Sequence, residues 1–146
     1  MSQKSFIPVL RELARAYQEF ESFSSSHIRT LDLTPSQFDI VATLGNTDGM
    51  SFKELGEKTL ITKGTLTGVV DRLEAKNLVR RVASPSDGRS QTVQLTRKGE
   101  TLFARIFPAH MVHIGQAFTS FSQADIDNMQ TVLSRLRTAL SAAHNK

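Results

Sequence analysis

The stretch SFKELGEKTLITKGTLTGVVDRLEAKN, residues 51–77, decides the fold because it encodes two helices separated by a very short turn. Ser51 and Glu54 have the spacing of a capping box, in which the side chain of each residue accepts a hydrogen bond from the backbone N–H of the other. This pair predicts a short helix that starts at Ser51 and ends near Thr59.

A second helix follows after only three or four residues, with Thr62 as its N-cap and Asn77 as its stop. Its apolar residues fall at helical spacing on one stripe: Leu66, Val69, Val70 and Leu73. Asparagine suits the left-handed backbone that commonly follows a helix C-terminus. Two helices joined by so short a turn form a helix-turn-helix.

The residues after this pair predict an antiparallel hairpin. Segments 78–82 and 92–95 are rich in β-branched and apolar residues, and they flank the polar loop SDGRS at 86–90. In a winged helix-turn-helix, a hairpin of this kind follows the second helix, and that helix enters the DNA major groove.

Helical periodicity extends on both sides of this unit. Apolar residues predict one helix over residues 6–29 and another from Thr34 to Leu44. A long helix is expected after Thr96, and a capping-box pattern at 122–125 opens the last helix. The fold class is therefore mainly α with a small β-hairpin wing (α+β).

The amino-acid composition argues against several classes of protein. The chain has no cysteine, which rules out disulfides and thiolate chemistry. It also lacks a nucleophile with a paired base and a phosphate-cradling glycine loop, so we expect no enzyme and no cofactor. Asp71 and Glu74 lie one helical turn apart but are expected to form a solvated face. Without an 18-residue apolar run or a signal-peptide pattern, we expect a soluble cytoplasmic protein without a membrane partner.

Positive charge is concentrated in the middle of the chain. The net charge is +4, and residues 51–100 hold ten Lys and Arg residues against six Asp and Glu residues. A basic segment of this kind favours a polyanionic partner such as double-stranded DNA.

The second helix carries small and polar residues on the face opposite its apolar stripe. Glycine and threonine are poor helix formers, so an exposed face built from them lowers helix stability and adds no packing contacts. Small side chains let a backbone approach base edges, and hydroxyls and cations can reach bases or phosphates. The predicted DNA contacts of this helix and the first strand are Thr62, Lys63, Gly64, Thr65, Thr67, Gly68, Arg72 and Arg80.

The hairpin loop supplies the remaining predicted contacts: Ser86, Asp87, Gly88 and Arg89. An arginine at a hairpin tip can enter the minor groove, where A·T-rich stretches concentrate negative potential. Asp87 can accept a hydrogen bond from Arg89 and hold its side chain extended. The simpler alternative is that Asp-Gly only forms a good turn and that Arg89 is a solvated charge.

These segments together resemble the MarR family of bacterial transcriptional regulators over almost the whole chain. The resemblance is carried by LTPSQFDIVATL, GTLTGVVDRLEAKNLVRR and, most specifically, DGRSQTVQLTRKG, which holds a D-x-R pair followed by V-x-L-T-x-x-G. Asn77 departs from the pattern, because members usually have glycine there.

The resemblance implies a homodimer that binds a pseudo-palindromic operator, most often as a repressor. Residues 1–32 and 97–146 would form a helical dimerisation region, and residues 33–96 the winged helix-turn-helix DNA-binding domain, intertwined as one domain. Many relatives release DNA when a small aromatic or phenolic ligand binds between these regions. The candidate effector residues here are Tyr17, His27, Arg29 and Phe38, although no motif marks the site and a place in the core is the favoured interpretation of Tyr17 and Phe38.

Two alternatives stay open at this point. One is a winged helix that binds proteins and never touches nucleic acid, which salt-dependent binding to any duplex would separate from a DNA regulator. The other is a metal-responsive regulator, because His110 and His113 are spaced to chelate and His27 could approach them. No further histidine or acidic cluster accompanies them, so we predict no metal site.

Overall fold

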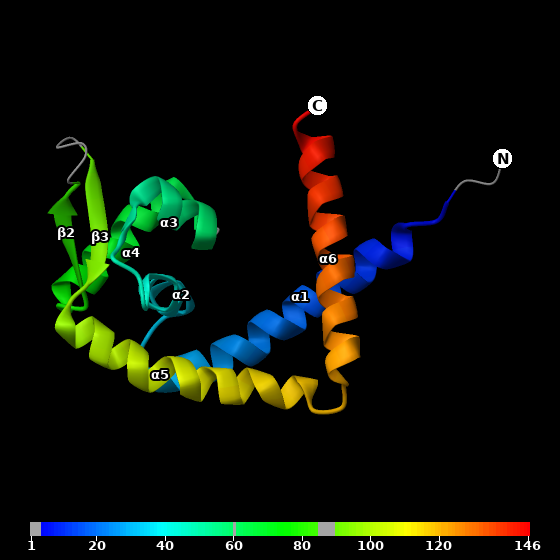
Figure 1. The fold of residues 1–146 in the computed structure, drawn as a ribbon, viewed down its shortest axis with the longest axis horizontal. Helices are drawn as coiled ribbons and strands as arrows, with labels where there is room; N and C mark the ends of the chain where they lie inside the picture. The colour runs from blue at the N-terminus through cyan, green and yellow to red at the C-terminus, as the bar shows by residue number, and fades with distance from the viewer. Residues whose placement is uncertain (1–3, 60, 85–89) are drawn as a thin grey trace. The chain divides into compact units, whose positions relative to one another are not determined.

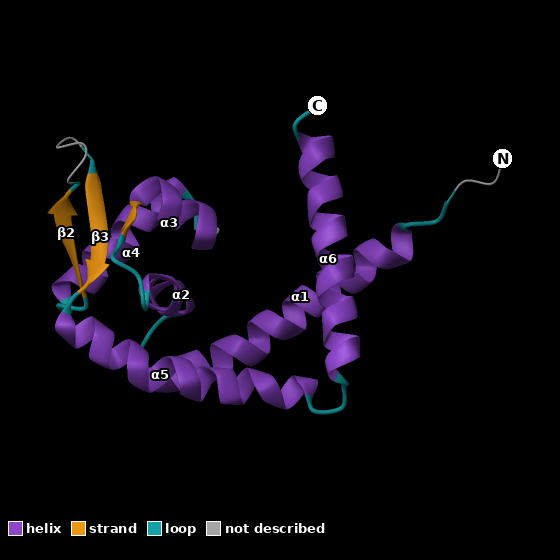
Figure 2. Cartoon of the chain, in the orientation of Figure 1, coloured by secondary structure: helices purple, strands orange, loops and turns teal. Residues whose placement is uncertain are grey.

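The computed structural model describes residues 4–59, 61–84 and 90–146 (Figure 1). The helices are α1 (Ile7–Ile28), α2 (Pro35–Leu44), α3 (Phe52–Thr59), α4 (Lys63–Ala75), α5 (Arg97–Gly115) and α6 (Gln123–His144). Two short 3-10 turns are η1 (Arg29–Leu31) and η2 (Gln116–Phe118). The strands are β1 (Met50–Ser51), β2 (Val79–Ala83) and β3 (Gln91–Leu95) (Figure 2). The predicted class, mainly α with a small β wing, is confirmed.

The chain divides into two compact units, Met1–Met111 and Val112–Lys146. The first holds α1 to α4, the sheet and most of α5, and the second holds the end of α5, η2 and α6. In the second unit, Ser122 and Asp125 form the predicted capping box, with both reciprocal hydrogen bonds present. None of the helices in the described part of the chain combines the length and the apolar composition needed to span a bilayer.

Capping side chains start α2 and α3 where the sequence placed them. The Thr34 hydroxyl accepts from the Gln37 N–H at 3.2 Å, and the Gln37 side chain accepts from the Thr34 N–H at 3.1 Å. The Glu54 N–H likewise donates to the Ser51 hydroxyl at 3.1 Å. Each such cap contributes roughly 1 kcal/mol to helix stability. The stop at Asn77 is also confirmed, because this residue has φ +61°.

The predicted hairpin is part of a three-stranded antiparallel sheet in the order β1-β3-β2. β2 and β3 pair from Val79↔Leu95 to Ala83↔Gln91. The sequence did not predict β1, because a two-residue strand has no periodicity to detect. Met50 of β1 pairs with Val93, so β3 becomes the central strand. Leu78 lies one residue before β2, and its carbonyl accepts from the Thr96 N–H at 3.0 Å.

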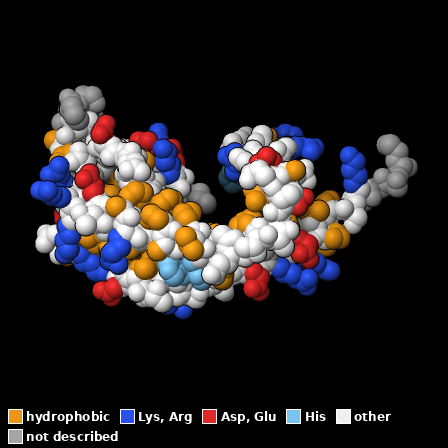
Figure 3. All heavy atoms as spheres, turned by 60° about the horizontal axis from the view of Figure 1, so that its bottom comes forward, with side chains coloured by type: hydrophobic (Ala, Val, Ile, Leu, Met, Phe, Trp, Pro, Cys, Tyr) orange, Lys and Arg blue, Asp and Glu red, His pale blue; other side chains and the backbone are white. Residues whose placement is uncertain are grey.

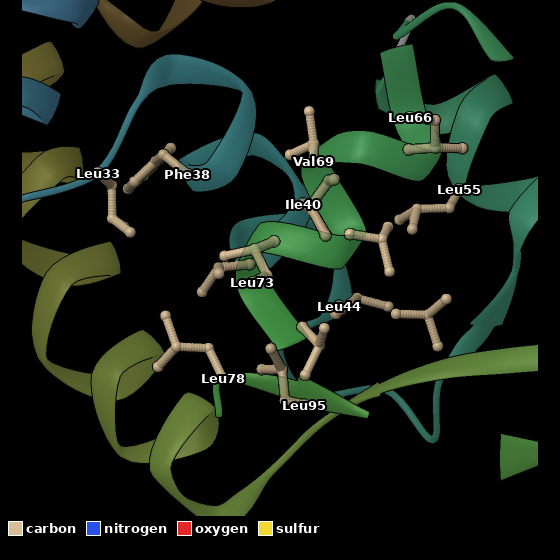
Figure 4. Packing of buried hydrophobic residues seen from close by; sticks show 14 of the residues in the cluster. Leu33, Phe38, Ile40, Leu44, Leu55, Leu66, Val69, Leu73, Leu78 and Leu95 are labelled. Atoms are coloured by element: carbon tan, nitrogen blue, oxygen red, sulfur yellow. The ribbon is translucent and has the colours of Figure 1, made fainter. Parts of the chain in front are cut away.

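The core lies between the helix-turn-helix, the sheet and the start of α5 (Figure 4). The apolar stripe of α4 is fully part of it: Leu66, Val69, Val70 and Leu73 are all buried. Ile40, Val41 and Leu44 of α2 and Leu55 of α3 meet this stripe from the other side. The helical spacing in the sequence therefore identified the inner face of α4 correctly.

Asp39 is a half-buried carboxyl group on α2, and burial raises its pKa from 3.8 to about 6. The unfolded chain loses this proton near pH 4 while the folded protein keeps it, so this residue's contribution to stability falls as pH rises from about 4 to about 6. We expect Asp39→Asn to remove that fall and to raise the free energy of unfolding at pH 7.5 by ~1 kcal/mol, discounted for partial exposure. Urea unfolding of both proteins at several pH values measures the difference, and a difference that does not change with pH contradicts the expectation.

Candidate nucleic-acid interface

Helix α4 turns a face of small and polar side chains to solvent. Thr62, Lys63, Gly64, Thr65, Thr67 and Arg72 are exposed and Gly68 is partly exposed, so the structure places the predicted contacts of this helix on its outer side. A Cβ added at Gly64 or Gly68 would meet nothing within 4 Å. Internal packing therefore does not require glycine at either position.

The N-terminus of α4 is exposed to solvent. Thr62 occupies the N-cap position with extended backbone (φ −63°, ψ 148°), but its side chain makes no capping hydrogen bond. Its hydroxyl instead donates to the Thr65 hydroxyl at 3.1 Å. The sequence placed this N-cap correctly but not its hydrogen bond. The partial positive charge of the helix N-terminus favours an anion such as a phosphate.

Arg81 of β2 links the sheet to α4 through ion pairs. The sequence did not predict this role. Its guanidinium pairs with the Asp71 carboxylate, and its Nη1 lies 3.5 Å from Glu74 Oε1. Its Cζ lies 5.5 Å from the centre of the Phe52 ring of α3. Asp71 and Glu74 stay exposed to solvent, as expected, but their pairing with Arg81 was not predicted. Strand alternation was the available signal, since it puts Arg81 on the same side of β2 as the buried Val79.

Arg80 lies on the opposite side of β2 and is exposed. Its Nε donates to Gln94 Oε1 of β3 at 3.1 Å, and Gln94 Nε2 donates to the Asp48 carbonyl at 3.1 Å. Arg80 therefore stays on the wing surface with its direction set by Gln94.

The predicted wing-tip residues Ser86, Asp87, Gly88 and Arg89 lie outside the described residues. The strands that lead to them are paired as far as Ala83↔Gln91, and the Ser84 N–H donates to the Ser90 carbonyl at 3.0 Å. The contacts assigned to the tip stay predictions.

A cavity of about 780 Å³ lies beside α4, between this helix, α3 and the sheet. Lys53 of α3 and Lys63 and Thr67 of α4 line it together with Arg81. The surface next to the exposed face of α4 is therefore hollowed and carries positive charge.

The four candidate effector residues do not form one group. His27 and Phe38 meet at His110 of α5: the two histidine Nδ1 atoms lie 2.8 Å apart, and the Phe38 and His110 ring centres are 4.6 Å apart. Arg29 instead lines a hollow with residues of α1 that include Gln18 and Glu21.

Tyr17, ten residues before His27 on α1, is 60% exposed, and ten helical residues span about 15 Å. His110 is almost fully buried and also lies 3.1 Å from the Ser24 hydroxyl through Nε2. Figure 3 shows hydrophobic side chains gathered beside histidine side chains on one face of the molecule.

The predicted contact between His27 and His110 is present. Among the residues that the structure describes, however, no three histidine, cysteine, aspartate or glutamate side chains are grouped to hold a metal ion. Within the described residues, no set of ligands therefore supports the metal-responsive alternative.

A helix-turn-helix, a following hairpin and an exposed polar second helix define a winged helix-turn-helix DNA-binding protein. Comparison with known proteins agrees with this class. The sequence profile described as the MarR family matches residues 33–91. The HTH-type transcriptional regulator MhqR of Bacillus subtilis is 32% identical over 146 residues, which is 100% of both chains.

Solved structures of related regulators are also similar to this chain. The Bordetella bronchiseptica regulator BpsR, whose DNA binding is regulated by 6-hydroxynicotinic acid, is 27% identical with a TM-score of 0.77 over 89% of this chain and 98% of its own. A Listeria monocytogenes MarR-family regulator complexed with a 26mer DNA has a TM-score of 0.80 at 18% identity, covering 98% and 92%. This chain belongs to the MarR family of transcriptional regulators, which are DNA-binding proteins and not enzymes.

Proposed function

We propose that this protein is a homodimeric repressor that binds a pseudo-palindromic operator and releases it when a small ligand binds. Helix α4 enters the major groove through its exposed face, and the wing carries Arg89 to the adjacent minor groove. The observation that carries this proposal is the outer face of α4, where Gly64 and Gly68 open onto unfilled space. A regulator of bacterial transcription acts in the cytoplasm, where the chromosome lies.

The pairing of Arg81 with Asp71 and Glu74 supports the same arrangement. It ties β2 to α4 within the first unit, so the wing and the recognition helix can meet DNA as one surface. Phosphate contacts then fix the position of the protein, while base contacts by Thr65 and Thr67 select the sequence.

Lys63 is expected to contact a phosphate. Lys63→Ala should reduce the slope of log Kd against log salt by about one unit per half-site, because one fewer counterion is released at each phosphate. Fluorescence anisotropy on an operator fragment at four salt concentrations measures the slope. Lys4→Ala, which removes a charge outside the helix-turn-helix, should leave the slope unchanged, and an unchanged slope for Lys63→Ala removes this contact from the proposal.

The homodimer is supported by apolar side chains that each unit leaves exposed. In the first unit they lie mainly on α1 and on the residue before it: Phe6, Ile7, Val9, Leu10, Leu13, Tyr17 and Phe20. In the second unit α6 exposes Val132, Leu133 and Leu140. Exposed apolar rows of this length are typical of surfaces that a partner covers. Residues 1–32 and 97–146 are therefore proposed as the dimerisation region, and 33–96 as the DNA-binding domain.

Leu133→Asp is expected to dissociate the dimer, because it places a charge in an apolar contact that the second copy would cover. Sedimentation equilibrium at micromolar concentration should give a monomer mass for this variant and a dimer mass for the unmodified chain. Thr131→Asp, on the far side of α6, should stay dimeric. A monomeric unmodified chain contradicts the proposal.

The proposed effector is a small aromatic or phenolic molecule, as suggested by the 6-hydroxynicotinic acid that regulates BpsR. We place its ring beside His27, which is partly exposed and contacts His110 where α1 meets α5. Operator release measured across a set of aromatic acids tests this, with Phe38→Leu expected to weaken the response. A set that releases no DNA at millimolar concentration counts against ligand control of this kind.

A further inference from the structure

Two carboxylates on the second half of α4 lie in line with the predicted DNA contacts of its first half. Asp71 follows Gly64 by seven residues, and at about 100° per residue the two lie about 20° apart around the helix. Glu74 follows Thr67 with the same offset, which spans about 10 Å along the axis. The Asp71 and Glu74 side chains are 55% and 43% exposed. A duplex that meets the outer face of α4 therefore brings phosphates near two negative charges.

Arg81 of β2 pairs with both of these carboxylates. Its guanidinium contacts Asp71, and its Nη1 lies 3.5 Å from Glu74 Oε1. The same side chain lines the cavity of about 780 Å³ together with Lys63 and Thr67. The ion pairs therefore lie beside the predicted contacts, and the three paired side chains have a net charge of about −1, where the two carboxylates alone would have about −2.

These ion pairs are poorly placed to stabilise the fold. Water and salt screen ion pairs with exposed partners, so their contribution to stability is small. The Arg81 side chain is only 23% exposed, and its Nε is buried without a hydrogen-bond partner among the described residues. Burying part of a guanidinium with an unsatisfied N–H group costs free energy, which the nearby Phe52 ring offsets only in part. The charge of Arg81 therefore needs an explanation other than stability.

The position of the wing does not depend on these ion pairs alone. Leu78 and Val79, at the start of β2, are buried and belong to the core cluster. The Leu78 N–H also donates to the Leu73 carbonyl of α4 at 3.0 Å. Core packing therefore keeps β2 beside α4 when the ion pairs are removed.

We propose that Arg81 promotes DNA binding without contacting DNA, by neutralising the carboxylates of Asp71 and Glu74. It is a positioning residue for their charge, and this role rests on the proposed function in taking the outer face of α4 as the surface that meets DNA. The Debye length at physiological salt is about 8 Å, so phosphates that approach these carboxylates more closely are incompletely screened from them. Losing Arg81 alone leaves two unpaired negative charges, whereas losing all three charges leaves none.

The test compares variants by fluorescence anisotropy on a labelled duplex of random sequence at low salt, where binding is mainly electrostatic. Arg81→Gln should weaken binding about tenfold, because it doubles the negative charge that the phosphates meet. The double variant Asp71→Asn, Glu74→Gln should bind at least as tightly as the unmodified chain. Adding Arg81→Gln to this double variant should keep the affinity within about threefold of the unmodified chain.

Three results would overturn the proposal. Weaker binding by the double variant would mean that the ion pairs act by fixing the wing, which leaves the proposed function standing. A triple variant as weak as Arg81→Gln would mean that Arg81 itself contacts DNA or holds the structure. An affinity unchanged by Arg81→Gln would remove the residue from DNA binding altogether.

Two further variants complete the comparison. Arg15→Gln removes an arginine that is also paired, 3.6 Å from Glu12, but on α1, and it should leave the affinity unchanged. Arg81→Lys keeps the charge and should bind within about threefold of the unmodified chain. If thermal unfolding shows that Arg81→Gln is not folded, the double variant and Arg81→Lys decide the question, and a folded Arg81→Lys that has lost binding contradicts a role of charge. A chain that binds the random duplex but selects no operator fails only the proposed function.

Discussion

Replacing Arg89 with alanine is expected to weaken operator binding by about 1 to 3 kcal/mol in each half-site. A dimer that inserts this arginine twice would lose roughly two to six kcal/mol, enough to turn specific binding into the non-specific kind. The reason is that the narrow minor groove concentrates negative potential, and a long planar cation gains most from it. Quantitative gel-shift titration at fixed salt measures the loss.

Two further variants separate charge from geometry at this position. Arg89→Lys keeps the charge but loses the planar fork, so it should recover only part of the affinity. Asp87→Ala should cost less than Arg89→Ala if Asp87 acts only by orienting the arginine. An affinity unchanged by Arg89→Ala would take the wing tip out of the mechanism.

Gly99→Ala should lower the free energy of unfolding by about 2 to 3 kcal/mol, because it overfills a close backbone contact. An added Cβ would lie 2.1 Å from the Leu78 carbonyl oxygen, and that oxygen already accepts from the Thr96 N–H. The Leu78 carbonyl and the start of α5 are both main chain, so no change of side-chain rotamer can relieve this contact. The start of α5 must therefore shift off the sheet or the Leu78 hydrogen bond must break.

The matched control is Gly115→Ala at the other end of α5, where an added Cβ meets nothing within 4 Å. This change should raise stability by about 0.5 to 1 kcal/mol, since alanine is the better helix former. Urea unfolding of both variants gives the comparison. Equal effects of the two changes would mean that helix propensity, and not the contact with Leu78, determines the effect of the change at Gly99.

The sequence alone predicted the order of the helices, the hairpin and the inner face of α4, because capping side chains and helical spacing are local signals. The N-cap pair at Thr34 and the left-handed stop at Asn77 needed only residues within four positions of one another. The family resemblance rested on a similarly local pattern, the D-x-R and V-x-L-T-x-x-G residues of the wing.

Contacts between distant segments were decided by the tertiary structure. Strand β1 forms because Met50 pairs with Val93, which lies 43 residues further along the chain. Arg81 meets Asp71 and Glu74 because the sheet folds back on α4, and the meeting of His27 with His110 depends on how α1 packs against α5. Local rules state which face of an element is apolar, but not which charged or aromatic groups of other elements will lie opposite it. That choice is made by packing, when one core must bury the apolar faces of α2, α3, α4 and the sheet at once.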